Sequence, residues 1–91
     1  MPKTHKIKLN YEFQEPILSG EKTFEVRYND RGYQKGDLVE FLVAEGRRSV
    51  HEPLDGKLFE ITYVLSGWHI DPGYVVFGIK PVKGGDGDGR S

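Results

Sequence analysis

The charged side chains with the most suggestive spacing lie in the segment 20–27, GEKTFEVR. Within it, Glu25 and Arg27 are two positions apart, so on a strand they share one face about 6.5–7 Å from each other. Lys22 stands just ahead of this strand. A carboxylate between two cations can hold both rigid and aim their donors at a phosphate or a base. The same pattern is typical of a solvated strand face whose ion pairs contribute about 0–1 kcal/mol, and spacing alone leaves both interpretations open.

Hydrophobic periodicity predicts a short helix just before this segment. Pro16 is tolerated only in a first helical turn, so the helix within residues 12–19 should begin near Phe13. Gly20 stands where a left-handed residue would end that helix. Alternation of polar and apolar residues predicts the surrounding strands, at residues 6–10, 22–28, 38–43, 57–65 and 74–82.

Three of these strands carry details that the fold must accommodate. In the fourth strand, alternation directs one set of side chains toward the core, namely Phe59, Ile61, Tyr63 and Leu65. In the last strand, Gly78 indicates a bulge or a close approach of backbone. In the motif strand, Phe24 and Val26 point to one side, whereas Glu25 and Arg27 point to the other.

The order of one strand, one helix and four strands predicts a mostly β (α+β) domain. We expect a small, partly closed barrel of about five strands, with one short helix after the first strand. The 91 residues fit one domain, which we place at residues 4–83. Residues 84–91 are rich in glycine and aspartate and have nothing to bury, so we predict a disordered tail there.

Composition excludes several classes of protein. The chain has no cysteine and three isolated histidines, so we expect no disulfide, no metal site and no cofactor. No apolar run approaches about 18 residues, so we expect no membrane span and a cytoplasmic location. The net charge of −1 argues against strong non-specific binding of polyanions. A nucleic acid would therefore need a local basic patch.

The pattern G-x-K-x-x-E-x-R resembles the motif of the ASCH domains, a branch of the PUA-like barrels, and is formed here by Gly20, Lys22, Glu25 and Arg27. The resemblance covers roughly residues 5–82, with Ile17-Leu18 before the glycine and the Gly36-Asp37 turn after the motif. The run 24–31, FEVRYNDR, is similar to small uncharacterised bacterial and phage ASCH-like proteins. The resemblance therefore implies a PUA-like barrel.

The same resemblance implies that the domain binds RNA, as a single strand or at a modified nucleoside, in a cleft between the first helix and the barrel. Lys22, Glu25 and Arg27 would line this cleft, and Gly20 would shape it. Some ASCH proteins resemble metal-independent amidohydrolases of N4-acetylcytidine, which use a motif lysine, a threonine three residues later and a distant glutamate. Lys22 matches that lysine and is the catalytic candidate, but Glu25 stands where the threonine belongs. Binding is therefore favoured, with such a hydrolase as the alternative.

The loop after the motif strand carries three further candidates for the binding site. Asn29, Arg31 and Tyr33 are residue types that contact or stack on exposed bases. The alternative interpretation is a polar turn in which Tyr33 packs on the edge of the core.

Two other segments leave their roles open. Arg47 and Arg48 either contact phosphates or remain solvated. Trp68, beside His69, is either a lid over the core or a stacking platform. A third hypothesis for function is a protein-interaction module of phage or bacterial origin, with the motif charges purely structural. We expect a monomer.

Overall fold

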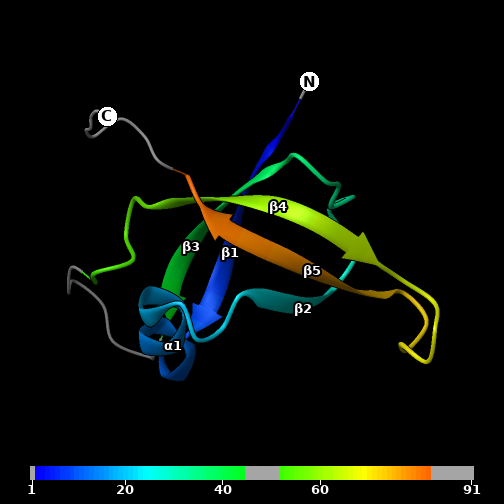
Figure 1. Ribbon diagram of the computed structural model, residues 1–91, viewed down its shortest axis with the longest axis horizontal. Helices are drawn as coiled ribbons and strands as arrows, with labels where there is room; N and C mark the ends of the chain where they lie inside the picture. Colours follow the sequence, from blue (N-terminus) through cyan, green and yellow to red (C-terminus); the bar gives the residue numbers. More distant parts are fainter. Residues whose placement is uncertain (1, 45–51, 83–91) are drawn as a thin grey trace.

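The computed structural model describes residues 2–44 and 52–82. In this part the elements follow one another as β1 (Thr4–Asn10), η1 (Tyr11–Phe13), α1 (Gln14–Ser19), β2 (Phe24–Tyr28), β3 (Leu38–Ala44), β4 (Leu58–Leu65) and β5 (Tyr74–Pro81). The strands form one sheet in the order β1-β3-β4-β5-β2 (Figure 1). β1 pairs with β3 in parallel, and the other neighbours are antiparallel. The prediction of a mostly β domain with a short helix after the first strand is confirmed.

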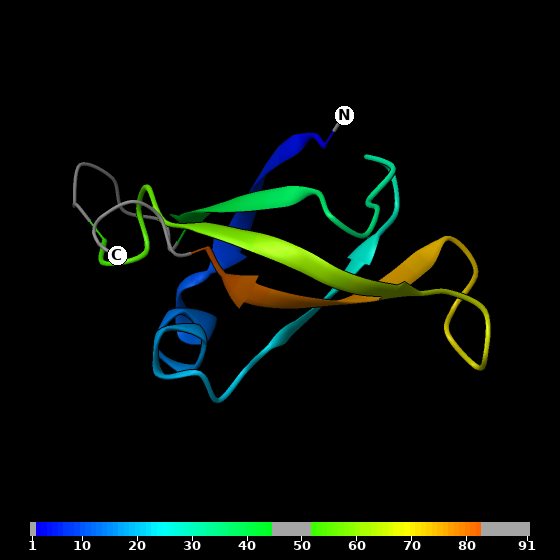
Figure 2. The ribbon, with the colours of Figure 1, turned by 45° about the horizontal axis from the view of Figure 1, so that its top comes forward.

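The sheet curls into a half-barrel, and β1 and β2 are its two open edges (Figure 2). Alternating side chains of the strands fill the hollow of the barrel, and Ile17 of the helix joins them. The buried apolar residues of the strands are Ile7, Leu9, Val39, Phe41, Phe59, Ile61, Val75, Phe77 and Ile79. Burial of this apolar surface is the main contribution to the stability of the fold. The half-barrel therefore holds the backbone of its edge strands, β1 and β2, in place.

Gly20 ends the helix as predicted. Its φ of 85° lies in the left-handed region, which costs glycine little, and its N–H donates to the carbonyl of Ile17 at 3.2 Å. The N–H of Lys22 then donates to the carbonyl of Pro16 at 2.9 Å. These two bonds reverse the chain and fix the start of β2 beside the helix.

The buried side chain of Gln14 was not predicted. Its amide donates to a carboxylate oxygen of Glu52 at 3.0 Å and accepts from the N–H of Leu54 at 3.1 Å. The helix is thereby tied to the segment that leads into β4.

A bulge in β4 explains Gly78 and corrects the prediction for Tyr63. Ile61 faces Ile79 and Tyr63 faces Gly78, so Thr62 is an extra residue in β4. A Cβ at Gly78 would lie 2.5 Å from Oγ1 of Thr62, so the bulge needs glycine here, and the prediction is confirmed. The inward prediction for Tyr63 is wrong, because the extra residue reverses the alternation. Tyr63 is 64% exposed.

A buried polar pair fixes the loop before β3 to the start of β1. Nε2 of His5 lies 2.8 Å from Oδ2 of Asp37. The same carboxylate accepts from the N–H groups of Lys3 and Gln34, each at 3.1 Å. Burial alone would raise the pKa of Asp37, but the hydrogen bonds from His5 and these two amides hold it below the ordinary value. Asp37 is therefore a structural residue.

Some predictions fall on residues that the structure does not describe. These are the Arg47–Arg48 segment and the tail at residues 84–91. Within residues 2–44 and 52–82, no helix has the length and apolar character needed to cross a membrane.

Candidate functional site

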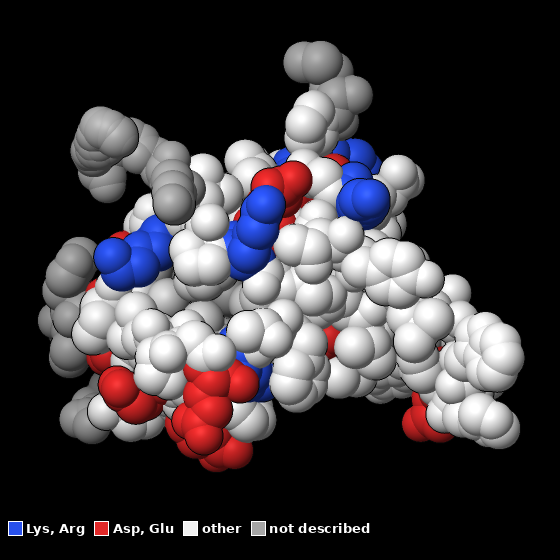
Figure 3. All heavy atoms as spheres, viewed as in Figure 1, with Lys and Arg blue, Asp and Glu red and all other residues white. Residues whose placement is uncertain are grey.

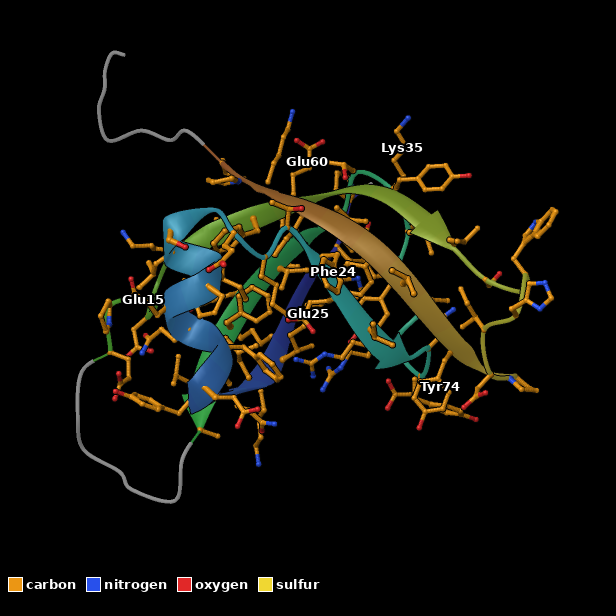
Figure 4. The ribbon with its side chains drawn as sticks, turned by 60° about the horizontal axis from the view of Figure 1, so that its bottom comes forward. Glu15, Phe24, Glu25, Lys35, Glu60 and Tyr74 are labelled. Atoms are coloured by element: carbon orange, nitrogen blue, oxygen red, sulfur yellow. The ribbon has the colours of Figure 1, made fainter. Side chains whose placement is uncertain are left out.

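Glu25 is the centre of the charged motif, and it is buried. It projects from β2 toward the hollow of the barrel and is 4% exposed, whereas its neighbours Phe24 and Val26 face solvent. One carboxylate oxygen accepts from Nζ of Lys22 at 3.0 Å, and the other accepts from Nε of Arg27 at 3.1 Å. Figure 4 shows Glu25 in the space between β2 and β1. The three charges of the motif therefore form one cluster rather than a solvated strand face.

Lys22 is held by more than the carboxylate. Its ammonium also donates to the carbonyl of Phe24 at 2.7 Å. The rings of Phe13 and Phe24 lie beside it, with centroids 5.1 and 5.0 Å away, within the range of cation–π attraction. The Lys22 side chain is only 15% exposed. Lys22 thus ties the first helical turn to the start of β2.

Arg27 connects the two open edges of the sheet. Its Nη2 donates to the carbonyl of Lys8 on β1 at 2.5 Å, while Nε is bound to Glu25. The Arg27 side chain remains 24% exposed. Because two separate acceptors fix one planar group, the guanidinium has a defined orientation with part of its surface in solvent.

Two adjoining hollows run along this junction and share Lys8, Arg27 and Tyr28; together we call them the β1–β2 groove. One has a volume of about 310 Å³ and reaches Asn10, Phe13 and the buried Glu25. The other, of about 430 Å³, adds Lys6, Asp30, Arg31 and Tyr33. The groove therefore contains four basic side chains, Lys6, Lys8, Arg27 and Arg31, and two acidic ones. It is a local basic patch on a chain of net charge −1.

Asn29 and Tyr33 shape the end of the groove. Oδ1 of Asn29 accepts from the N–H of Tyr33 at 2.9 Å, which closes the turn after β2. The Tyr33 ring is buried against His5 and Phe77, with each centroid 4.7 Å away. Burial raises the pKa of the Tyr33 hydroxyl, while Arg27 and Arg31 act in the opposite direction. This geometry agrees with the interpretation of a polar turn whose tyrosine packs on the core.

The site residues predicted from the sequence thus fall into two groups, those that line the groove and those that support the backbone around it. Arg27, Arg31 and Tyr33 line the groove, whereas Gly20, Lys22 and Asn29 hold backbone in place. Lys6 and Lys8 were not singled out. They alternate with buried residues along β1, and only the tertiary fold places them beside Arg27.

Two other observations concern Trp68 and the absence of a metal site from the described residues. Of the two interpretations of Trp68, the lid over the core is wrong, because this side chain is 79% exposed. In the described ranges, no three histidine, aspartate or glutamate side chains lie close enough together to hold a metal ion.

Residues 4–79 match the model of a family described as a domain of unknown function, DUF3850. The chain belongs to this family. No curated protein matches the sequence. The part of the chain matched to DUF3850 begins with β1 and extends into β5, so it contains both edges of the β1–β2 groove.

Proposed function

We propose that this chain binds RNA, as a single strand or at a modified nucleoside, in the β1–β2 groove. The observation that carries the proposal is the gathering of Lys6, Lys8, Arg27 and Arg31 along one groove in a nearly neutral chain. Phosphate contacts with lysine and arginine supply most of the affinity in nucleic-acid binding. The resemblance of the segment 20–27 to the ASCH motif is the second support.

The fixed orientation of Arg27 supports recognition of a defined group. Glu25 and the carbonyl of Lys8 already bind two of its nitrogens, so its remaining donors point in one direction without further loss of side-chain freedom. Such a guanidinium can donate to a phosphate or to the edge of a base. Glu25 acts through Arg27 and does not itself contact the ligand in this proposal.

The size of the patch sets the expected affinity. Lys6, Lys8 and Arg31 are exposed, and Arg27 is partly so, which allows contacts to about two to four phosphates. For a single strand, log K should fall with log salt concentration with a slope of about −1.5 to −3. Binding should therefore be modest and moderately sensitive to salt.

The contacts of Lys22 support binding rather than hydrolysis. Its ammonium is shared between the carbonyl of Phe24 and the carboxylate of Glu25. Neither hollow of the groove includes Lys22 in its lining. A substrate in the groove would therefore meet Arg27 before it met Lys22.

Fluorescence anisotropy of labelled single-stranded RNA oligomers tests this proposal. The variant Lys8→Gln/Arg31→Gln should weaken binding about tenfold, because two phosphate contacts are lost. The matched control is Lys57→Gln/Lys80→Gln, which removes the same charge from exposed positions outside the groove lining. It should leave the affinity within about twofold of the wild type. Equal losses in both variants, or no binding by the wild type at several hundred micromolar, would refute the proposal.

A further inference from the structure

The β4–β5 loop (residues 66–73) combines strained backbone with an exposed tryptophan. Trp68 and His69 have φ values of 47° and 67°, and they are the only non-glycine residues with positive φ among those that the structure describes. Such conformations disfavour ordinary side chains and cluster at binding sites. Trp68 is also 79% exposed, although tryptophan is the side chain with the most apolar surface to bury. Neither the strained backbone nor the exposed indole stabilises the fold. We therefore interpret this loop as a place where a ligand binds.

Backbone hydrogen bonds and close packing hold the β4–β5 loop in place. The N–H of Ile70 donates to the carbonyl of Gly67 at 2.9 Å, which closes a turn around Trp68 and His69. At the base of the loop, the N–H of Asn29 donates to the carbonyl of Gly73 at 2.8 Å. Gly73 lies so close to β2 that a Cβ there would be 2.6 Å from the ring of Tyr28. The exposed indole is therefore presented from a fixed base.

This base connects the loop to the β1–β2 groove. Tyr28 lines both hollows of the groove and also a third hollow, formed with the loop residues Ser66, Gly67, Ile70, Asp71, Pro72 and Gly73. Tyr28 and Tyr74 meet edge to face, with centroids 5.4 Å apart. Figure 3 shows few charged side chains on the right of the molecule, the side on which Figure 1 places this loop. Tyr28 and Tyr74 thus lie between the basic groove and a hollow formed by the loop that carries Trp68.

We propose that Trp68 is a stacking platform for an unpaired nucleobase. This inference rests on the proposed function, because the base would belong to the strand whose phosphates occupy the β1–β2 groove. Aromatic side chains stack on bases of any sequence, since every base has a π face. Because Tyr28 lines both the basic groove and the hollow formed by this loop, a strand in the groove passes close to the loop, which favours a nucleic acid over a protein partner.

Trp68 is the only tryptophan of the chain, so its emission reports on this position alone. Short single-stranded RNA should quench the emission, and the quenching should saturate at the same concentration as the anisotropy of labelled RNA. An abasic oligomer of equal length should bind more weakly and leave the emission unchanged. Trp68→Ala should weaken binding of the base-containing RNA about tenfold, and Trp68→Phe should retain most of the affinity, because a ring remains for stacking.

The outcomes separate the two proposals. If RNA binds by anisotropy but Trp68 is not quenched and Trp68→Ala binds equally well, stacking is refuted and the groove proposal stands. Quenching by the abasic oligomer would also refute stacking. A blue shift of the emission with protein concentration alone would assign Trp68 to a protein contact instead. Absence of any RNA binding would remove the proposed function and the stacking with it.

Discussion

Glu25→Gln should lower the free energy of unfolding. The loss should be larger than for an acid-to-amide substitution at any other acidic residue of the segment 20–27. The change is isosteric, but glutamine keeps one oxygen and turns an amide N–H group toward the other cation. One charge-assisted bond to Lys22 or Arg27 is lost, and the cation that made it stays largely enclosed. A bond to a charged group contributes about 1.5–3 kcal/mol.

The magnitude follows from burial. Removing one partner of a fully buried pair costs about 3–5 kcal/mol. Water relieves part of that cost here, because the Lys22 and Arg27 side chains are 15% and 24% exposed. We therefore expect the free energy of unfolding to fall by about 2–4 kcal/mol, which corresponds to a lowering of Tm by roughly 10–25 °C in a domain of this size.

Urea and thermal denaturation monitored by circular dichroism measure this change. Glu60→Gln is the matched control, because Glu60 pairs with Lys80 at 3.9 Å in solvent. That exposed pair is worth about 0–1 kcal/mol, so the control should unfold almost as the wild type does. If Glu25→Gln is no more destabilising than Glu60→Gln, the cluster is not a structural support and our reasoning about Arg27 fails.

Three further results are expected. The pKa of Asp37 is lowered in the folded state, so the stability that the wild type has over Asp37→Asn should be present at about pH 5 and shrink as the pH falls below the ordinary value of 3.8. Denaturation at several pH values measures this difference, and a difference that persists unchanged to about pH 2 would contradict the assignment. Gly78→Ala should cost about 1–2 kcal/mol in urea denaturation, because its Cβ would meet Thr62, and Thr62→Ala in the same chain should restore most of the loss. The wild type should leave N4-acetylcytidine unchanged when the mixture is followed by chromatography, and deacetylation that is lost in Lys22→Ala would contradict the structural role of Lys22.

Local signals in the sequence predicted the elements well. The strands follow alternation, and Gly20 and Gly78 each mark a backbone requirement that other residues meet poorly. Alternation failed at Tyr63, because an inserted residue shifts the phase and leaves no mark in composition. In β2, alternation separated Glu25 from Phe24 but did not tell which of them faces the core.

The candidate site was only partly predictable, because it depends on contacts between distant segments. The motif spacing indicated that Lys22, Glu25 and Arg27 belong together. The bond from Arg27 to the carbonyl of Lys8 joins residues 19 positions apart, and nothing in the sequence indicates it. Lys6 likewise lies in the groove only because the sheet curls and brings β1 beside β2.

Chemical-shift mapping during titration with a short single-stranded RNA tests the central claim most directly. If the β1–β2 groove is the binding site, the amide signals of Lys8, Arg27 and Arg31 should shift progressively, and those of Lys57 and Lys80 should stay in place. Shifts confined to residues outside the groove, or no shift near Arg27 at high micromolar RNA, would contradict the account.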